Sequence, residues 1–259
     1  MTEETFDYVI VGAGSAGCVL ADRLTEGGGA SVLLLEYGGS DRSLYIQMPA
    51  ALSIPMNMPR YNWFFYTEPE PGLGGRRLHT PRGKVLGGSS SINGLVYVRG
   101  NPLDFERWAS EGAAGWAYRD VLPYFKRTER RDGGGDTYRG GDGQVHTRYG
   151  ALDNPLNEVW LTAGREAGYP YTRDMNGFQQ EGFGRMDMTV GGGRRSSAAN
   201  AYLRPAMRRR NLAVRTHSLA TRVLFDGRRA IGVAYRRGRA ENVARARREV
   251  IVSAGPIQS

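Results

Sequence analysis

The chain has little cysteine, histidine and lysine, and it has no long apolar run. Its single cysteine, Cys18, cannot form a disulfide within the chain, which suits a reducing compartment. Because Cys18 sits in an apolar helical run, we interpret it as a small buried hydrophobe rather than a nucleophile. The longest uncharged segment, residues 8–21, is too short and too rich in glycine to cross a bilayer. We expect a cytoplasmic protein, with peripheral attachment to the inner face of the membrane as the alternative.

Lysine is scarce because arginine supplies nearly all of the positive charge. Only Lys84 and Lys126 are lysines, and the formal net charge is +9. A basic surface can neutralise nucleic-acid phosphates, but the excess gathers in residues 204–210 and 236–248, beside strand-like segments. We interpret these segments as solvated faces and expect no nucleic-acid partner. Nothing in the sequence indicates a metal site.

Glycine, in contrast, is abundant. The 37 glycines follow no regular triplet, which excludes a collagen-like chain. They cluster in short pieces such as GAGSAG and GGG, which is typical of loops where two backbones approach closely. With 259 residues, 40% of them hydrophobic, the chain can bury the core of one large domain or of two.

The amino-terminal segment FDYVIVGAGSAGCVLADRLTEGGGASVLLLEYGG predicts a β-α-β unit. Residues 8–11 and 31–35 are apolar and rich in β-branched or leucine side chains, as in buried parallel strands, and residues 15–24 have helical spacing. Gly12, Gly14 and Gly17 lie between the first strand and the helix, and Glu36 ends the second strand. This is the context that a dinucleotide-binding fingerprint requires.

Each position of this fingerprint has a physical role. Gly12 makes a tight turn, Gly14 lets the backbone approach a pyrophosphate, and Gly17 allows close packing of helix and strand. The helix amino terminus, where Ser15 and Ala16 lie, favours the anion. The Glu36 carboxylate would accept hydrogen bonds from the ribose hydroxyls.

The remaining elements are predicted from periodicity and turn residues. Residues 41–75 are irregular, which is typical of a lid or binding loop. We expect helical spacing over 103–131, helices at 154–168 and 196–209 (the latter capped by Ser196 or Ser197), and strands at 144–149, 183–190, 212–216, 221–225, 231–236 and 249–253. The Asp226-Gly227 pair indicates a hairpin turn.

A second glycine-serine loop, RGKVLGGSSSINGLVYVRG, spans residues 82–100. We interpret Gly87, Gly88 and the backbone of Ser89 to Ser91 as another face of the site for the same extended cofactor. This segment closely resembles the signature of the glucose-methanol-choline family of flavoprotein oxidoreductases. The resemblance continues through RYNW, TEPEP, YRGGDG, NGFQQEGFG, RRSSAANAYL, TRVLFDGRRAIGV and AGPIQS, and within the family it is strongest to bacterial members that oxidise choline.

The resemblance implies FAD as the cofactor and places further residues beside it. Those expected along the FAD are Val85, Gly88, Asn93, Gly94, Leu95 and Val96, with Val223 at the adenine end and Ala254 and Gly255 in the returning strand. Some relatives attach the flavin through a histidine where this chain has Ile92, so we expect non-covalent FAD. Tyr37 stands where the family usually has alanine, and we expect it to alter packing over the adenine.

The resemblance also implies the reaction, an FAD-dependent oxidation of a primary, choline-like alcohol to the aldehyde by hydride transfer to flavin N5. The expected partners are a small alcohol and an electron acceptor, a quinone or another acceptor rather than oxygen. Catalytic residues are unknown and expected beyond Ser259, because His79, His146 and His217 match no family position. The alternative is a catalytically incomplete FAD-binding fragment, so we expect the 259-residue chain alone to be inactive. Aromatic residues 61–66 fit either a cation–π site for a quaternary ammonium or core packing.

These observations predict an α/β fold: an FAD-binding doubly wound (Rossmann-like) domain with the start of an antiparallel-sheet substrate domain. We assign residues 1–143 to the first part of the FAD-binding domain, including a lid or loop region at 41–80. Residues 144–193 are assigned to the substrate domain, and residues 194–259 to the returning part of the FAD-binding domain. We interpret the chain as truncated after residue 259.

Overall fold

The computed structural model describes residues 2–151 and 153–259, which form two compact units. Unit 1 is Met1–Gly94 with Ser197–Ser259, and unit 2 is Leu95–Ser196. These boundaries follow backbone proximity. The predicted division into 1–143, 144–193 and 194–259 is by function, into FAD-binding and substrate domains, and it stays a prediction.

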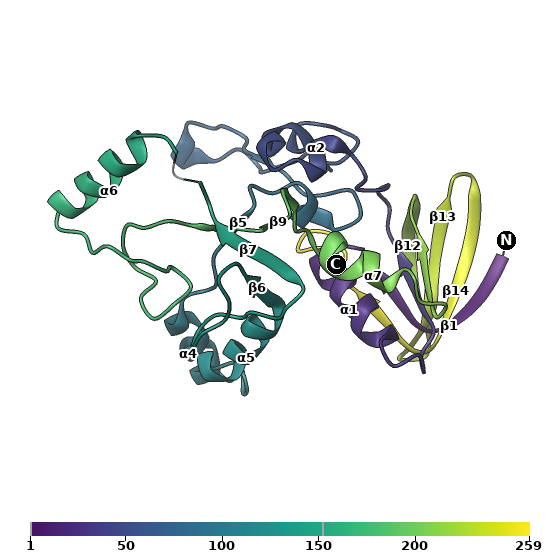
Figure 1. Cartoon of the computed structure of the whole chain (residues 1–259). Helices are drawn as coiled ribbons and strands as arrows, with labels where there is room; N and C mark the ends of the chain where they lie inside the picture. The colour runs from purple at the N-terminus through teal and green to yellow at the C-terminus, as the bar shows by residue number, and fades with distance from the viewer. Residues whose placement is uncertain (1, 152) are drawn as a thin grey trace. The chain divides into compact units, whose positions relative to one another are not determined.

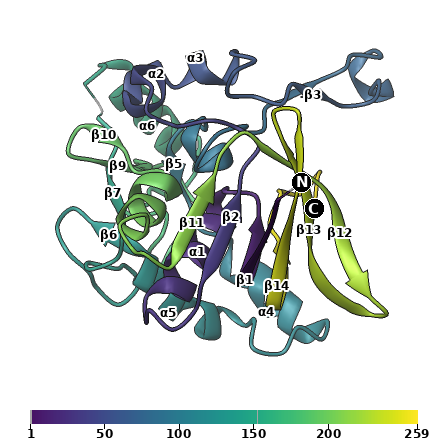
Figure 2. The same cartoon turned by 90° about the vertical axis from the view of Figure 1, so that its right-hand side faces the viewer.

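Unit 1 is built on a six-stranded sheet in the order β11-β2-β1-β14-β13-β12, seen side by side in Figure 2. The first four strands pair in parallel and the last two are antiparallel. Their bounds are β1 Thr2–Val11, β2 Val32–Leu35, β11 Leu212–Arg215, β12 Ser218–Asp226, β13 Arg229–Arg237 and β14 Ala240–Val252. Helix α1 (Ser15–Thr25) connects β1 to β2. The predicted Rossmann-like fold is confirmed.

Apolar side chains of the parallel and antiparallel strands meet in one core. All four residues of β2 are buried, as expected for a strand covered on both faces. The core cluster consists of Val9, Leu33, Leu35, Val233, Tyr235, Ala244 and Ala246. Burial of a large apolar side chain contributes about 1.5–3 kcal/mol, so this cluster fixes β1 and β2 against β13 and β14. The β12–β13 hairpin turns at Asp226 and Arg229, close to the predicted turn.

The helix predicted at 196–209 is shorter than expected. The structure has a wide helical turn η4 (Ala199–Leu203) followed by α7 (Arg204–Ala206). The predicted cap is present, because the Oγ of Ser197 accepts a hydrogen bond from the Asn200 N–H at 3.2 Å. Both segments pack near α1.

The irregular region after β2 contains only short elements. They are α2 Leu44–Gln47, η1 Pro49–Ala51, α3 Ser53–Met56, β3 Phe65–Tyr66, η2 Pro71–Leu73, β4 His79–Thr80 and η3 Gly88–Ser91. A second core cluster of Ile46, Tyr61, Val85 and Ile92 joins this region to the glycine-serine loop. The predicted loop is therefore packed rather than loose.

Unit 2 has a four-stranded sheet in the order β5-β8-β7-β6, of which Figure 1 labels β5, β7 and β6. Its β5–β8 and β8–β7 pairs are antiparallel, and the β6–β7 pair is parallel. The elements of unit 2 are β5 Val96–Tyr97, α4 Pro102–Ser110, α5 Tyr118–Thr128, β6 Glu129–Arg131, β7 Val145–Tyr149, α6 Leu156–Glu166, β8 Asp187–Met188, β9 Val190–Gly191 and β10 Arg194–Arg195.

Two predictions in unit 2 were too long. Helical spacing over 103–131 is interrupted where Gly112 and Gly115 adopt positive φ, and its last three residues form β6. Within 183–190, Phe183 pairs with Tyr171 in an isolated bridge, so regular strand is confined to β8 and the start of β9.

Arg139 is the centre of unit 2. Its guanidinium is fully buried and forms ion pairs with Glu129, Asp174 and Asp187. Burial opposes both charges, yet the hydrogen bonds between them dominate, so the pKa of Glu129 is lowered and that of Arg139 is raised. Arg99 adds a second ion pair to Glu129 at 2.8 Å. This network joins β6 and β8 to the loops on either side.

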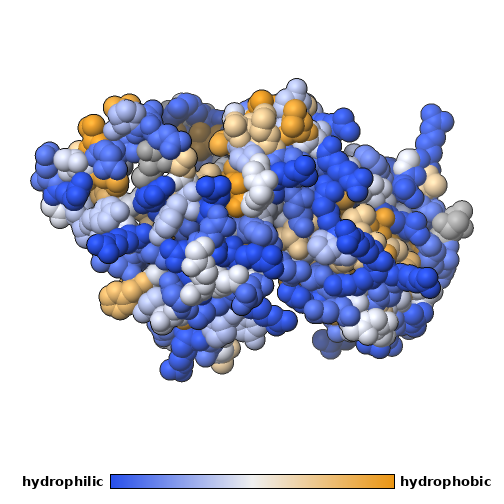
Figure 3. All heavy atoms as spheres, in the orientation of Figure 1, coloured by the Kyte–Doolittle hydropathy of each residue, from blue (hydrophilic) through white to orange (hydrophobic). Residues whose placement is uncertain are grey.

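Figure 3 shows that one face of the protein is mostly hydrophilic, with apolar residues gathered over α2 and α6. Within the described ranges 2–151 and 153–259, no helix has the length and apolar character needed to cross a membrane.

Several arginines of the basic segment 236–248 form ion pairs with acids of β1: Arg245 with Glu3, and Arg247 with Asp7.

Candidate cofactor-binding site

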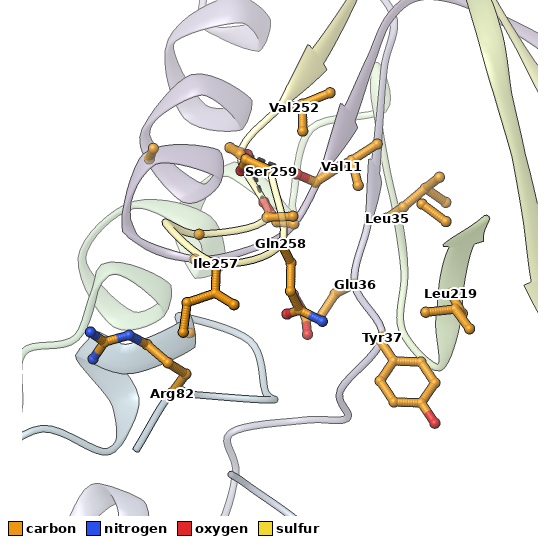
Figure 4. Close-up of a pocket in the computed structure, with 18 of the residues that line it drawn as sticks. Val11, Leu35, Glu36, Tyr37, Arg82, Leu219, Val252, Ile257, Gln258 and Ser259 are labelled. Atoms are coloured by element: carbon orange, nitrogen blue, oxygen red, sulfur yellow. Dashed lines mark hydrogen bonds between the residues drawn. The ribbon is translucent and has the colours of Figure 1, made fainter. Parts of the chain in front are cut away.

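A cavity of about 790 Å³ opens in unit 1 where β1, β2 and β14 end and α1 begins (Figure 4). In open α/β sheets, ligands bind at the carboxyl ends of the strands. The predicted site residues that line this cavity are Gly12, Gly14, Ser15, Ala16, Glu36, Gly88, Val223, Ala254 and Gly255. The structure thus brings together residues from both ends of the chain.

The first glycine loop has no room for side chains. Gly12 has φ +96°, and a Cβ there would lie 2.5 Å from the carbonyl oxygen of Ser253. A Cβ on Gly17 would lie 1.9 Å from the carbonyl oxygen of Gly12. A Cβ on Gly14, however, would meet no atom within 4 Å. Gly12 and Gly17 are therefore required by packing, whereas Gly14 presents bare backbone to the cavity at the amino terminus of α1.

The second glycine loop lies directly against the first. Gly88 has φ +54°, and a Cβ there would lie 2.7 Å from the Cα of Gly14. A Cβ on Gly83 would in turn lie 2.2 Å from the carbonyl carbon of Gly88. Three stretches of backbone are thus stacked at van der Waals distance, and this close approach accounts for the glycines of RGKVLGG.

The three serines that follow shape this loop with their side chains. Ser89 Oγ accepts a hydrogen bond from the Gly83 N–H at 3.1 Å, and Ser91 Oγ donates to the Leu86 carbonyl at 2.7 Å. Ser90 Oγ donates to the Gly87 carbonyl and accepts from the N–H of Ala198. The serine hydroxyls stabilise the conformation of the loop. Its residues Gly88 and Ser89 form part of the cavity wall.

Glu36 lies at the end of β2 with only 7% of its surface exposed. Its Oε2 accepts the Ala13 N–H at 2.9 Å, and its Oε1 accepts the Gly38 N–H at 2.7 Å. Burial raises the pKa of this carboxyl, and the two N–H donors only partly offset that effect. Each carboxylate oxygen has a second lone pair, so Glu36 can also accept a hydrogen bond from a ligand in the cavity.

Further residues of the wall were not predicted as site residues. They include Trp63, Phe65, Arg82, Gly83 and Ser253, whereas Ser89, whose backbone was expected to face the cofactor, also lines the cavity. Arg82 is the first residue of the glycine-serine segment 82–100, and Ser253 directly precedes Ala254. Their proximity in sequence to predicted site residues could have indicated that both line the site. Trp63 lies in an irregular loop, where no periodicity indicates which way a side chain points.

The other predicted site residues lie elsewhere. Among the residues described, the lining of this cavity does not include Gly17, Val85, Asn93 or Gly94. Gly17 packs beneath the turn and Val85 is in the second core cluster. The remaining two belong to unit 2: Leu95 is buried with φ +70°, and Val96 begins β5. Their assignment to the cofactor stays a prediction.

No histidine of the described chain lines the cavity. His79 stacks between Phe64 and Tyr66, and its Nε2 lies 2.9 Å from the Nδ2 of Asn62. His146 is in β7, and His217 occupies the turn between β11 and β12 with φ +55°. None of them is placed here to accept a proton in the cavity.

A parallel sheet with this glycine cradle and an acid at the end of its second strand defines a Rossmann-like dinucleotide-binding protein. A family profile described as GMC oxidoreductase matches residues 6–259, and the chain belongs to that family. FAD is the cofactor of GMC oxidoreductases, and the bare backbone at Gly14 together with the Glu36 carboxylate fits a pyrophosphate and a ribose.

Curated relatives and solved structures agree with this assignment. The chain is 56% identical over 257 residues to the oxygen-dependent choline dehydrogenase of Photobacterium profundum, covering 98% of this chain and 45% of the relative. It is 55% identical over 253 residues to the enzyme of the same name from Brucella anthropi, covering 98% and 46%. The chain spans about half the length of these relatives.

Among solved structures, pyridoxine 4-oxidase from Mesorbium loti matches with a TM-score of 0.90 and 33% identity, covering 96% of this chain and 49% of that one. An FAD-dependent oxidoreductase from Chaetomium thermophilum matches with a TM-score of 0.88 and 32% identity, covering 96% and 45%.

Proposed function

We propose that the chain binds FAD non-covalently in the cavity of unit 1. The observation that carries this proposal is the bare backbone of Gly14 at the amino terminus of α1, where a Cβ would meet no atom within 4 Å and a pyrophosphate can approach. Glu36 would hold the adenosine ribose by its free lone pairs. The proposed cofactor residues are Gly12, Gly14, Ser15, Ala16, Gly17, Glu36, Val85, Gly88, Asn93, Gly94, Leu95, Val96, Val223, Ala254 and Gly255.

Non-covalent binding is supported by the surroundings of Ile92. This side chain has no nucleophilic atom and is buried in the core cluster with Ile46, Tyr61 and Val85. A histidine that bonds to the flavin would need a ring nitrogen at the cofactor. The same position in this chain serves packing.

For a protein with the full length of the choline dehydrogenase relatives, the proposed reaction is oxidation of a primary, choline-like alcohol to the aldehyde. Bound FAD supplies the hydride-accepting centre. The residues of this chain bind and orient the cofactor and exclude water from its phosphates. The names of the choline dehydrogenase relatives support the substrate class, and they state dependence on oxygen, so oxygen is a candidate acceptor beside a quinone.

The second candidate function is FAD binding without turnover. It is supported by the absence of histidine from the cavity lining described above and by the chain's coverage of about half of its relatives. In that case unit 1 is a cofactor-binding half-site, and a proton acceptor for the alcohol has to come from another polypeptide segment.

The test is an absorbance spectrum of the purified chain after incubation with FAD and desalting. A retained flavin band that trichloroacetic acid releases into the supernatant is the expected result. A Gly12→Ala variant, whose new Cβ meets the Ser253 carbonyl, is expected to lose the band. Soluble folded protein without flavin would overturn the proposal. Choline is then added without oxygen or any other acceptor, so that hydride transfer to the flavin bleaches its band, and oxygen or a quinone analogue added afterwards takes up the electrons and restores it. This bleaching separates the alcohol oxidoreductase from the binding half-site.

A further inference from the structure

We propose that Tyr37 and Trp63 form a stacking wall for the adenine ring, with Tyr37 acting as an added binding residue for the adenosine end of the cofactor. The inference rests on the proposed FAD function of unit 1. It concerns Tyr37, the residue that directly follows Glu36.

The two rings are stacked with each other and belong to the cavity. Their centroids are 5.0 Å apart and their planes differ by 20°. Phe65 continues the row, with its centroid 6.1 Å from that of Trp63. All three rings line the cavity, and Tyr37 keeps 42% of its surface exposed. An aromatic row with free surface inside a cavity is suited to a flat ligand.

Covalent connectivity places adenine at this row. Glu36 and Tyr37 are adjacent in sequence, and adenine is bonded directly to the ribose that Glu36 would hold. The phosphates are attached to one side of this ribose and the base to the other. The base is therefore expected beside Glu36, on the side away from the phosphates. Leu219 of β12 lines the same cavity as Tyr37, and Figure 4 labels both side chains. Rings and aliphatic side chains together provide an apolar slot for a purine.

The rings are held in place before any ligand binds. The backbone N–H of Trp63 donates to the Arg82 carbonyl at 3.0 Å, and Lys84 Nζ lies 5.6 Å from the centroid of the Trp63 ring. Behind Tyr37, a Cβ on Gly38 would lie 2.2 Å from the carbonyl carbon of Lys84, so the two segments pack backbone to backbone. Fixed rings lose little conformational entropy when a base stacks on them.

The contrasting explanation is that the stack only packs the irregular loop against β2. That role predicts no dependence on the base of the ligand. A stacking wall for adenine predicts that Tyr37 discriminates a purine from a smaller pyrimidine, because stacking depends on ring overlap.

The experiment measures dissociation constants of FAD, ADP and UDP for the whole chain by calorimetry or by competition against FAD. Tyr37→Ala is expected to raise the Kd of FAD and of ADP about fivefold to tenfold and to change that of UDP less than twofold. Tyr37→Phe, which keeps the ring, is expected to stay within twofold of the parent chain. Tyr124→Ala is the matched control, because Tyr124 is exposed on α5 of unit 2.

Intrinsic fluorescence gives an independent readout. Trp63 is the tryptophan of the cavity wall, so ADP is expected to quench part of the emission, and Trp63→Phe is expected to remove that quenching. The inference is overturned if the Tyr37→Ala chain binds ADP as tightly as the parent, if it weakens UDP as much as ADP, or if quenching persists without Trp63. If the folded parent chain binds no FAD, the proposed function itself fails, which is a separate result.

Discussion

The Cα of Gly14 lies 2.7 Å from the point that a Cβ on Gly88 would occupy. The two glycines are separated by 73 intervening residues, yet their backbones touch in the wall of the cavity. Neither the amino terminus of α1 nor the glycine-serine loop forms this wall alone. The contact therefore explains the glycine at position 88, whereas Gly12 and Gly17 are required by their own contacts with Ser253 and within the first loop.

Substitution of Gly88 by alanine is expected to damage both the fold and the site. Alanine would have to adopt φ +54° and would collide with Gly14, and each effect costs about 1–3 kcal/mol. We expect a lower free energy of unfolding in urea and loss of FAD after desalting. Gly27→Ala is the control, because a Cβ there meets no atom within 4 Å. Equal stability of the Gly88→Ala and parent chains would contradict this explanation.

Local patterns made unit 1 predictable. The β1-α1-β2 unit depends on an apolar strand, a helical period and three glycines that are close in sequence, and each was correctly located. Cys18 was also correctly interpreted as buried. The Asp226-Gly227 turn signal located the β12–β13 hairpin for the same reason.

Long-range contacts were not predictable from one sequence. Composition favours a strand over 183–190, but Phe183 instead forms an isolated bridge with Tyr171. The local sequence does not indicate this bridge. The stack of Tyr37 on Trp63 joins a strand end to an irregular loop. Such contacts depend on how separate segments pack, which periodicity does not encode.

Glu36 is expected to make FAD binding sensitive to acid. Burial raises its folded pKa above the ordinary value of 4.5, so the carboxylate takes up a proton at a pH where an exposed glutamate is still ionised. A protonated oxygen loses its acceptor role toward the ribose, and the Kd of FAD should rise as the pH falls through this window above 4.5. Fluorescence titration of FAD at a series of pH values measures the effect.

The stability of the FAD-free chain should respond to Glu36 with the opposite sign. In the same window the folded state binds more protons than the unfolded state, so the contribution of Glu36 to the free energy of unfolding falls as pH rises. Glu36→Gln has no titratable group and should show neither dependence. Identical pH profiles of FAD affinity for Glu36→Gln and the parent chain would refute this role.

Asp7 should contribute to acid unfolding. Hydrogen bonds from Arg247 and from the N–H and hydroxyl of Ser31 hold the pKa of Asp7 well below its ordinary value of 3.8. A lowered folded pKa gives stability that is present above 3.8 and is lost as pH falls toward the folded pKa. The urea midpoint of Asp7→Asn should therefore be lower than that of the parent at pH 7 and should approach it below pH 3.8. A constant difference across pH would contradict this assignment.

The Cys18 thiol should be unreactive in the folded chain. It is fully buried, its Sγ donates to the Ala13 carbonyl at 3.2 Å, and burial raises its pKa to about 12. Since the thiolate is the reactive form, labelling by Ellman's reagent should proceed no faster than unfolding. The same chain in concentrated urea should label at once. Rapid labelling without denaturant would show that α1 opens locally or that the thiol is exposed.

Removal of the Arg139 charge should destabilise unit 2 more than removal of an arginine from a surface ion pair does. Arg139→Met removes the ion-pair partner of buried Asp187 and leaves Glu129 and Asp174 with only Arg99 and Arg131, respectively. Breaking a buried pair on one side costs about 3–5 kcal/mol. Arg119→Met is the matched control, because Arg119 is 87% exposed and 3.7 Å from Asp120, a geometry worth about 0–1 kcal/mol. Hydrogen exchange followed by mass spectrometry should show faster exchange in β6 and β8 of the Arg139 variant. Equal protection in the two variants would mean that apolar packing, rather than this ionic network, holds unit 2 together.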